Sequence, residues 1–144
     1  MSHRPIRSII EGRTLVTAES HFTVSHAARL MREHKIGALV VCEEGRLVGV
    51  FTERDALFRV TADDRDAQTT LVRDVMTPDP QTIAPDKPLG HALHMMYEGG
   101  FRHVPVLENG KPVGIVSARD AFGPELKEFV DEMDQREHIA EILG

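Results

Sequence analysis

Hydrophobic runs with strand character occur twice along the chain in the same arrangement. Residues 38–42 and 47–51 are almost wholly apolar, and so are residues 104–107 and 113–116. A short polar segment containing a glycine separates the two runs of each pair, and in the second pair it includes Asn109-Gly110. Apolar, β-branched runs on either side of such a turn predict two β-hairpins.

Helical spacing of apolar residues precedes each hairpin. Such residues fall on one helical face from Val24 to Met31 and again from Leu89 to Met96. We therefore expect one helix to start near Val24 and another near Leu89. Gly99-Gly100 supplies a C-terminal stop for the second of these helices.

A short strand in front and a second helix behind complete each unit. Residues 14–17 and 81–84 predict the short strands, and the second helices are expected to begin after Thr52 and Ser117. The predicted order in each unit is therefore strand, helix, strand, strand, helix.

The two units are copies of one another at a constant offset of 65 residues. Thr17 corresponds to Thr82, and Arg54-Asp55 corresponds to Arg119-Asp120, without a gap between these points. A repeat of this kind predicts a pseudo-symmetric pair with related clefts at the junction. Units of about 60 residues are marginal on their own, so we expect both copies to fold as one body.

The polar segment 61–70 is expected to be an exposed connector between the copies. Its position divides the chain into a first unit over residues 1–65 with a core over 14–60, and a second over 66–124 with a core over 72–123.

Residues 125–144 follow Gly123-Pro124 and predict an acidic amphipathic helix. This helix either caps the body or serves as an oligomerisation or partner-binding element. Its apolar positions are Leu126, Phe129, Val130, Met133, Ile139, Ile142 and Leu143.

Charge and composition narrow the possible functions. The 144 residues carry a formal net charge of −6, which offers no general basic surface for nucleic acid. An anionic ligand would need local Arg side chains and helix N-termini. There is no apolar run long enough to span a membrane and no signal-peptide pattern at the N-terminus, so we expect a cytoplasmic protein that does not bind membranes.

The only cysteine, Cys42, excludes an intramolecular disulfide and any zinc site that needs several cysteines. It lies within an apolar run, which indicates a small core residue, with a reactive thiol as the alternative. His91 and His94 have a spacing that can chelate a metal on a helix, but no further ligand accompanies them. We therefore expect no metal site.

Each copy ends with the same candidate binding motif, a strand followed by Gly-x-x-Thr/Ser-x-x-Asp. Thr52 and Ser117 can cap the following helix, which leaves free N–H groups and the positive end of the helix dipole beside them for a phosphate. Asp55 and Asp120 lie one turn further on, and a carboxylate there can accept hydrogen bonds from both hydroxyls of a ribose.

Arg54 and Arg119 sit within the same motif and can add charge-assisted hydrogen bonds to phosphate. A ligand-free interpretation of the motif exists, because Ser/Thr-x-x-Asp is also a capping box. Its duplication in one context, each time after Val-Gly and before Ala, favours binding, although duplication of the unit would also produce it.

These features together resemble a tandem pair of CBS domains (cystathionine-β-synthase-type repeats, also called a Bateman module). The resemblance covers the chain from about Ile6 to Phe122. Copy one departs from the pattern at Ile10-Glu11-Gly12 and at Ser20, which stands in place of Pro85. The matching features, besides the two Thr/Ser-x-x-Asp ends, are Asp74-Val75-Met76-Thr77, Thr82-Ile83-Ala84-Pro85, Ala92-Leu93-His94-Met95-Met96 and His103-Val104-Pro105-Val106.

The resemblance implies a mixed α/β (α+β) fold of two pseudo-symmetric β-α-β-β-α repeats packed sheet to sheet, with a C-terminal helix added. It also implies adenine nucleotide binding in two clefts between the repeats, with AMP, ADP or ATP as the ligand and NAD as a further possibility. Such modules pair, so a homodimer is implied as well. No cofactor is obligatory in this family.

The implied clefts each mix the two copies. In the first cleft, Thr52, Arg54 and Asp55 would face the segments at Thr82 and at Arg102-His103-Val104. In the second cleft, Ser117, Arg119 and Asp120 would face Thr17 and Gly37-Ala38-Leu39.

The sequence predicts a non-catalytic regulatory module that binds an adenine nucleotide and acts on an unknown effector protein through a ligand-linked conformational change. No nucleophile elbow, Ser-His-Asp arrangement or phosphate-loop lysine motif indicates an enzyme. Three alternatives stay open: a structural dimerisation module with vestigial clefts, a sensor of another adenosyl ligand such as NAD or S-adenosylmethionine, and an enzyme that hydrolyses a nucleotide.

The two clefts are not equivalent in charge, and this yields a testable prediction. Arg102 and His103 of the first cleft correspond to Gly37 and Ala38 of the second, which carry no charge. We therefore expect the first cleft to bind tighter or to prefer more highly phosphorylated ligands. Replacing Arg102 with Ala should weaken nucleotide binding about tenfold in a calorimetric titration. Unchanged affinity would contradict this assignment.

Overall fold

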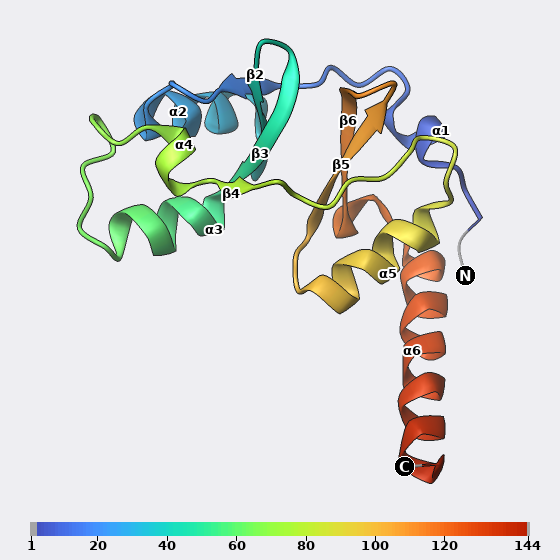
Figure 1. The fold of residues 1–144 in the computed structure, drawn as a ribbon. Coiled ribbons are helices and arrows are strands. Elements are labelled where there is room, and N and C mark those ends of the chain that lie inside the picture. Colours follow the sequence, from blue (N-terminus) through green and yellow to red (C-terminus); the bar gives the residue numbers. More distant parts are fainter. Residues whose placement is uncertain (1–2, 144) are drawn as a thin grey trace.

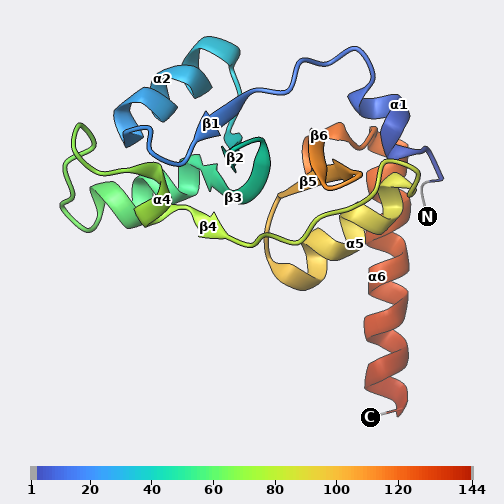
Figure 2. The same cartoon turned by 45° about the horizontal axis from the view of Figure 1, so that its top comes forward.

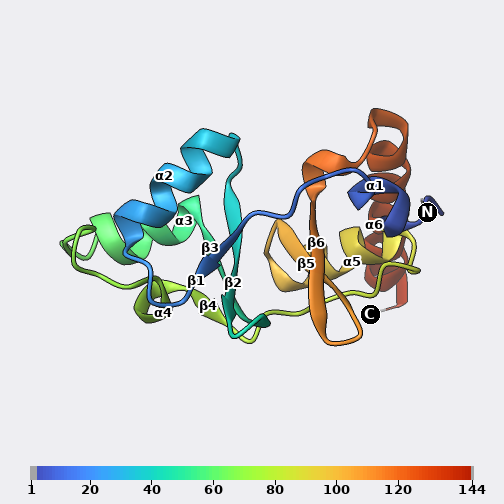
Figure 3. The ribbon, with the colours of Figure 1, turned by 90° about the horizontal axis from the view of Figure 1, so that it is seen from above.

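The computed structural model describes the backbone of residues 3–143 and the side chains of residues 3–137. It consists of two lobes side by side, each with a β-hairpin toward the centre (Figure 1). Seen from above, β2 and β3 face β5 and β6 across the middle of the molecule, with helices on the outer sides (Figure 3). Contacts between β3 and β6 join the two sheets, as expected for repeats packed sheet to sheet.

The elements divide between the lobes as follows. Lobe one comprises β1 (Thr17–Glu19), α2 (Val24–His34), β2 (Ala38–Glu43), β3 (Arg46–Thr52), α3 (Glu53–Asp55), the π-helical η1 (Ala56–Thr61), α4 (Val72–Val75) and β4 (Thr77–Pro78). Lobe two comprises α1 (Ile6–Ile10), α5 (Leu89–Gly99), β5 (His103–Glu108), β6 (Lys111–Ser117), the 3-10 turn η2 (Ala118–Asp120) and α6 (Gly123–Leu143).

The hairpins and the helices that precede them are confirmed. β2 pairs antiparallel with β3, and β5 with β6, each with a register shift near the turn. Both residues of each turn have positive φ, at 50° and 76° for Glu44 and Gly45 and at 54° and 78° for Asn109 and Gly110. Such two-residue turns match the twist of the strands that they connect.

The short strand expected over 14–17 is wrong in its bounds, because pairing begins only at Thr17, where β1 runs parallel to β2. The residues before it cross from lobe two to lobe one (Figure 2) and belong to no strand. The strand expected over 81–84 is reduced to one parallel bridge between Ile83 and Val106. The four-stranded sheet, in the order β1-β2-β3-β4, therefore has only a two-stranded counterpart.

The helix expected directly after Ser117 begins there but is a single 3-10 turn. It stops at Asp120, because Ala121 is extended with ψ of 130°. The chain then restarts as α6 at Gly123, with Pro124 in the first turn, where the missing N–H of proline costs nothing. The corresponding helix in lobe one continues from α3 through η1 to Thr61.

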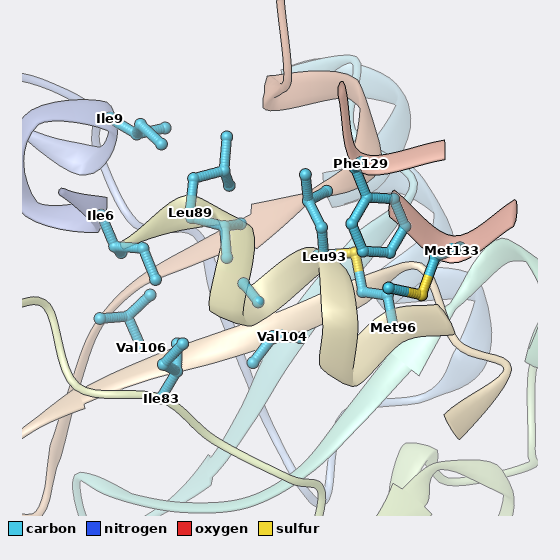
Figure 4. Packing of buried hydrophobic residues seen from close by; sticks show 12 residues of the cluster. Ile6, Ile9, Ile83, Leu89, Leu93, Met96, Val104, Val106, Phe129 and Met133 are labelled. Carbon is cyan, nitrogen blue, oxygen red and sulfur yellow. The ribbon is translucent and has the colours of Figure 1, made fainter. Parts of the chain in front are cut away.

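Two buried clusters form the cores, and each takes a segment from the other repeat. Ile6 and Ile9 of α1 pack against Leu89 and Val106 of lobe two (Figure 4). Conversely, α4, which lies just before copy two, buries Val72 and Val75 in the core of lobe one. The segments in front of the two repeats are thus exchanged between the lobes (Figure 2).

The glycine of each repeated Val-Gly pair makes room for an exchanged segment. A Cβ atom on Gly49 would lie 2.4 Å from Sδ of Met76, and one on Gly114 would lie 2.7 Å from Cγ2 of Ile10. A side chain at Gly49 would collide with Met76, and one at Gly114 would collide with Ile10. The repetition of Val-Gly therefore has a packing cause, independent of any ligand.

The C-terminal helix packs on lobe two through Phe129 and Met133, which lie against Leu93 and Met96 of α5 (Figure 4). This confirms its role as a packed element. Leu126 and Val130 on α6 remain largely exposed. Ile139, Ile142 and Leu143 lie outside the residues whose side chains are described. No helix within the described part of the chain is long and apolar enough to cross a membrane.

The exchange of segments makes a prediction about stability. Ile6 is 0% exposed although it lies near the N-terminus. Replacing it with Ala should lower the free energy of unfolding by about 2–5 kcal/mol in urea denaturation, because buried methyl groups are lost and a cavity remains. Leu57→Ala is the matched control, since Leu57 is 54% exposed. Equal effects of the two substitutions would contradict the packing of α1 in lobe two.

Candidate functional site

The two Thr/Ser-x-x-Asp motifs form reciprocal caps at the start of α3 and η2. The Thr52 amide donates to Oδ2 of Asp55 at 3.0 Å, and the Asp55 amide donates to Oγ1 of Thr52 at 3.2 Å. In copy two the Ser117 amide donates to Oδ2 of Asp120 at 2.8 Å. The capping interpretation is therefore correct, but it uses only one oxygen of each carboxylate.

The second carboxylate oxygen of each Asp faces an arginine. Oδ1 of Asp55 lies 3.6 Å from Nε of Arg59, one helical turn on. Oδ1 of Asp120 lies 2.8 Å from Nη2 of Arg13, which comes from the segment before β1. The two carboxylates are thus held in the same way by the backbone and in different ways by side chains.

Backbone hydrogen bonds place each cap beside the start of a strand. The Glu53 amide donates to the carbonyl of Gly37 at 3.0 Å, and the Ala118 amide donates to the carbonyl of Arg102 at 3.3 Å. These bonds join the motif of each copy to the beginning of its own hairpin. The strand start then reaches across to the cap of the other copy.

A first cleft, built on Thr52 and Asp55, lies at the junction of the lobes. It has a volume of about 750 Å³ and adjoins a further cavity of about 360 Å³ that shares Thr52, Arg102 and His103. The structure thus brings residues of both copies together in this cleft. Its lining is Thr52, Glu53, Arg54, Asp55, Phe58, Arg59, Thr77, Gly100, Phe101, Arg102 and His103.

A second cleft, built on Ser117 and Asp120, has a volume of about 360 Å³. Gly37 and Ala38 of copy one line it together with Arg119 and Asp120 of copy two. A pocket of about 420 Å³ continues it along α2 and shares Lys35, Ile36, Gly37 and Arg119. The mixing of copies expected for both clefts is therefore present in the geometry.

Four of the predicted site residues do not line these clefts. The side chains of Leu39 and Val104 are 0% exposed and belong to the two cores. Thr17 and Thr82 lie just past the lining segments. Residues 14–16 line the second cleft, Thr77 lines the first, and residues 79–81 line the cavity that adjoins it. The chain reaches each cleft a few residues earlier than predicted.

The sequence analysis missed three cations at the clefts. Arg13 and Lys35 line the second cleft, and Arg59 lines the first. Gly37 and Ala38 themselves carry no charge, but the second cleft gains Arg13 and Lys35 from other positions. Comparison of the repeats does not indicate these residues, because the other copy has no cation at the corresponding positions. At the offset of 65 residues, Arg13 corresponds to Pro78, Lys35 to Gly100 and Arg59 to Pro124.

His103 lines both clefts and so lies between them. Burial lowers the pKa of its imidazole, against the opposing charges of Glu53 and Asp120, while Arg102 and Arg119 lower it further. Its counterpart in copy one is Ala38, which is buried and apolar. A neutral imidazole at this point can donate one hydrogen bond and accept another.

The described part of the chain contains no cluster of metal ligands, and its cysteine is buried. No group of three or more His, Cys, Asp or Glu side chains there could hold a metal ion. His94 contacts Glu98 at 2.8 Å and Arg136 at 3.3 Å through its two ring nitrogens. Cys42 is buried in β2, and burial raises the pKa of its thiol, as expected of a core residue.

The family model for the CBS domain matches the chain twice, over residues 6–62 and 72–123. The chain belongs to the CBS-domain family. Each matched range begins with an exchanged segment, α1 in the first copy and α4 in the second. The residues that line the two clefts all fall within these two matched ranges.

Known relatives agree with this assignment. The chain is 36% identical over 106 residues to the CBS domain-containing protein YhcV of Bacillus subtilis, covering 74% of this chain and 75% of that protein. It is 42% identical over 100 residues to an uncharacterized 17.7 kDa protein of Acidianus ambivalens. That match covers 68% of this chain but 59% of the relative, so the CBS pair spans less than two thirds of that relative.

Solved structures show the same fold. A CBS-domain-containing protein from Agrobacterium tumefaciens superposes with a TM-score of 0.74 at 33% identity, covering 81% of this chain and 94% of that one. A hexameric CBS-CP12 protein from bloom-forming cyanobacteria gives a TM-score of 0.73 at 25% identity, over 81% and 65% of the two chains.

The lowered pKa of His103 predicts a pH-dependent stability of this CBS pair. Between that pKa and the ordinary value of 6.5 the unfolded chain binds more protons, so the free energy of unfolding should fall as pH drops below about 6.5. Urea denaturation at about pH 7.5 and 5.5 should show a smaller fall for His103→Gln than for the wild type. The exposed His91→Gln serves as control. A fall equal to that of the wild type would exclude His103 as the cause.

Proposed function

We propose that this CBS pair is a non-catalytic regulatory module that binds adenine nucleotides in the clefts between its lobes. The observation that supports it is the position of both Asp motifs. Asp55 and Asp120 each lie in a cavity lined by both copies and by several cationic side chains. A helix cap alone needs neither the cavity nor the cations.

In the first cleft, Asp55 would accept hydrogen bonds from the ribose hydroxyls through its outer oxygen. Arg54 and Arg102 would bind phosphate, and Arg59 stands beside the carboxylate. The cleft has room for a nucleotide, since about 750 Å³ lies within the usual range for ligand sites. The Thr52 hydroxyl lines the same cleft and would add a donor to the phosphate.

In the second cleft, Asp120 would hold the ribose, and Arg119 and Lys35 would meet the phosphate. Ile36, Val113 and Ile115 supply aliphatic walls against which an adenine ring can pack. Gly37 has no side chain at the strand start, and the carboxylate of Glu53 lies beside it, 3.0 Å from the place of a Cβ atom. Three cationic side chains line this cleft, as three line the first, so its charges also favour an anionic ligand.

The proposed mechanism is ligand linkage between the lobes. Because each cleft takes residues from both copies, a bound nucleotide contacts both lobes at once. A ligand that fits one arrangement of the lobes better shifts the population towards that arrangement. An effector protein or a second copy of the chain would sense the shift. A homodimer and an effector are parts of this proposal.

The non-catalytic assignment rests on the geometry of the two carboxylates. Each is fixed by a backbone N–H on one oxygen and by a nearby arginine on the other. Such a carboxylate is a positioned acceptor, whereas a general base needs a free lone pair beside a reacting group. NAD and S-adenosylmethionine share the adenosine part and are therefore ligands of the same class.

A dimerisation module with empty clefts is the second candidate. Leu57 and Phe58 on η1 are each 54% exposed, and such residues are frequent at protein interfaces. The hexameric CBS-CP12 protein is a relative that assembles. This candidate predicts a stable oligomer without any affinity for nucleotides.

Isothermal titration calorimetry with AMP, ADP, ATP and NAD tests the proposed function. We expect saturable binding that Asp55→Ala and Asp120→Ala each weaken by more than about tenfold, because a charged acceptor for ribose is lost. Thr23→Ala is the matched control. It removes the cap of α2, where Thr23 accepts from the His26 amide, without touching a cleft.

The outcomes separate the two candidates. Loss of affinity in the Asp variants, with Thr23→Ala near wild type, supports nucleotide binding. No heat with any of the four ligands would reject it, and the oligomeric state of the same sample would then decide for or against the dimerisation module. Conversion of a bound nucleotide to a product would reject the non-catalytic assignment.

A further inference from the structure

The second cleft contains an ion pair that has no counterpart in the first. Nη2 of Arg13 lies 2.8 Å from Oδ1 of Asp120. The Asp120 side chain is 12% exposed, and that of Arg13 is 51% exposed. The pair therefore closes over a nearly buried carboxylate from the solvent side, at the atom that the proposed function assigns to ribose.

Arg13 follows the end of α1, where its segment is anchored on lobe two. Its amide donates to the carbonyl of Ile10 at the end of α1, which packs in lobe two, and the chain then crosses to β1 in lobe one. On the other side of α1, Arg4 donates to the carbonyl oxygen of Asp120 at 2.6 Å. Two arginines from the exchanged segment thus contact the same residue, one at its backbone and one at its carboxylate.

The first cleft has a different arrangement. The residue that corresponds to Arg13 is Pro78, which carries no charge. Oδ1 of Asp55 has Arg59 at 3.6 Å, a longer contact made within its own helical segment. Contact of the carboxylate by an arginine that follows the exchanged segment of the other copy is therefore found at Asp120 and not at Asp55.

We propose that Arg13 exchanges partners when the second cleft binds its ligand. The guanidinium leaves Oδ1 of Asp120 and binds the phosphate of the nucleotide, and the freed oxygen accepts the ribose hydroxyls. Arg13 is then the residue that makes this cleft select an anionic nucleotide over the neutral nucleoside. This inference rests on the proposed function and adds a specificity device to it.

The selection follows from what each ligand offers the guanidinium. A nucleoside must break the ion pair with Asp120 and leaves Arg13 without an anionic partner. A nucleotide breaks the same pair but returns a phosphate, which suits the planar fork of an arginine. Arg119 and Lys35 line the same cavity, so the phosphate enters a cluster of cations that Arg13 completes.

The exchange also carries a structural consequence. In the free protein the ion pair fastens the crossing segment to lobe two through Asp120. After the exchange the same segment is fastened through the ligand. Ligand binding in the second cleft therefore changes how the segment between α1 and β1 is attached to lobe two.

Calorimetric titration with AMP and with adenosine tests this inference. The Asp55→Ala background restricts binding to the second cleft, and Arg13→Ala is introduced into it. We expect AMP to bind about tenfold more weakly and adenosine to bind as well as before or better, so the preference for AMP falls by about tenfold or more. Arg13→Lys keeps the charge and should keep most of the preference.

Arg7→Ala is the matched control. Arg7 also lies in the N-terminal segment and carries one positive charge, but it pairs with Glu108 on the exposed surface outside the cleft. This variant should leave the preference for AMP unchanged. An equal loss in Arg7→Ala and Arg13→Ala would reduce the effect to net charge and overturn the assignment.

The remaining outcomes are distinct. If AMP binds in the Asp55→Ala background and Arg13→Ala keeps the preference, the exchange is wrong and the proposed function stands. If adenosine weakens as much as AMP, Arg13 positions Asp120 and does not select the phosphate, which also rejects the exchange. If no nucleotide binds to the wild type, the proposed function and the exchange fail together.

Discussion

The exchange of two short segments between the lobes is the constraint on which the rest of this structure depends. Ile6 and Ile9 complete the core of lobe two, and Val72 and Val75 complete the core of lobe one. Small units of this size bury too little surface to be stable alone, so each borrows apolar side chains from the other repeat. Neither lobe has a complete core without the other repeat, so the two lobes fold together and the clefts form at their junction.

The same constraint explains why the clefts have their composition. Residues 13–16 of one crossing segment line the cleft at Asp120, and Thr77 of the other lines the cleft at Asp55. The glycines of the Val-Gly pairs allow Met76 and Ile10, just before these residues, to lie close against β3 and β6. Side chains on the crossing segments therefore become part of the cleft lining, whatever the repeats themselves carry.

Pseudo-symmetry in the backbone and asymmetry in the charges have different origins. The caps on Asp55 and Asp120 are alike because they depend on backbone groups, which any repeat of the same local sequence will reproduce. The arginines that face the outer oxygens come from Arg59 in one copy and Arg13 in the other, at positions that do not correspond. The two clefts thus share the way in which the backbone holds the Asp carboxylate and differ in the cations around it.

The sequence by itself determined the local elements of this protein. The helices from Val24 and Leu89, the two hairpins and the capping role of Thr52 and Ser117 depend on neighbouring residues, and periodicity and turn chemistry report such short-range preferences well. It also gave the family, since the repeated motif is local, and the mixing of the copies at each cleft through the resemblance. The tertiary structure alone decided the exchange of α1 and α4, the positions of Arg13 and Lys35, and the burial of Leu39 and Val104. All of these features depend on where segments distant in the sequence meet. Comparison of the two repeats does not reveal residues such as Arg13 and Lys35, because they differ between the copies.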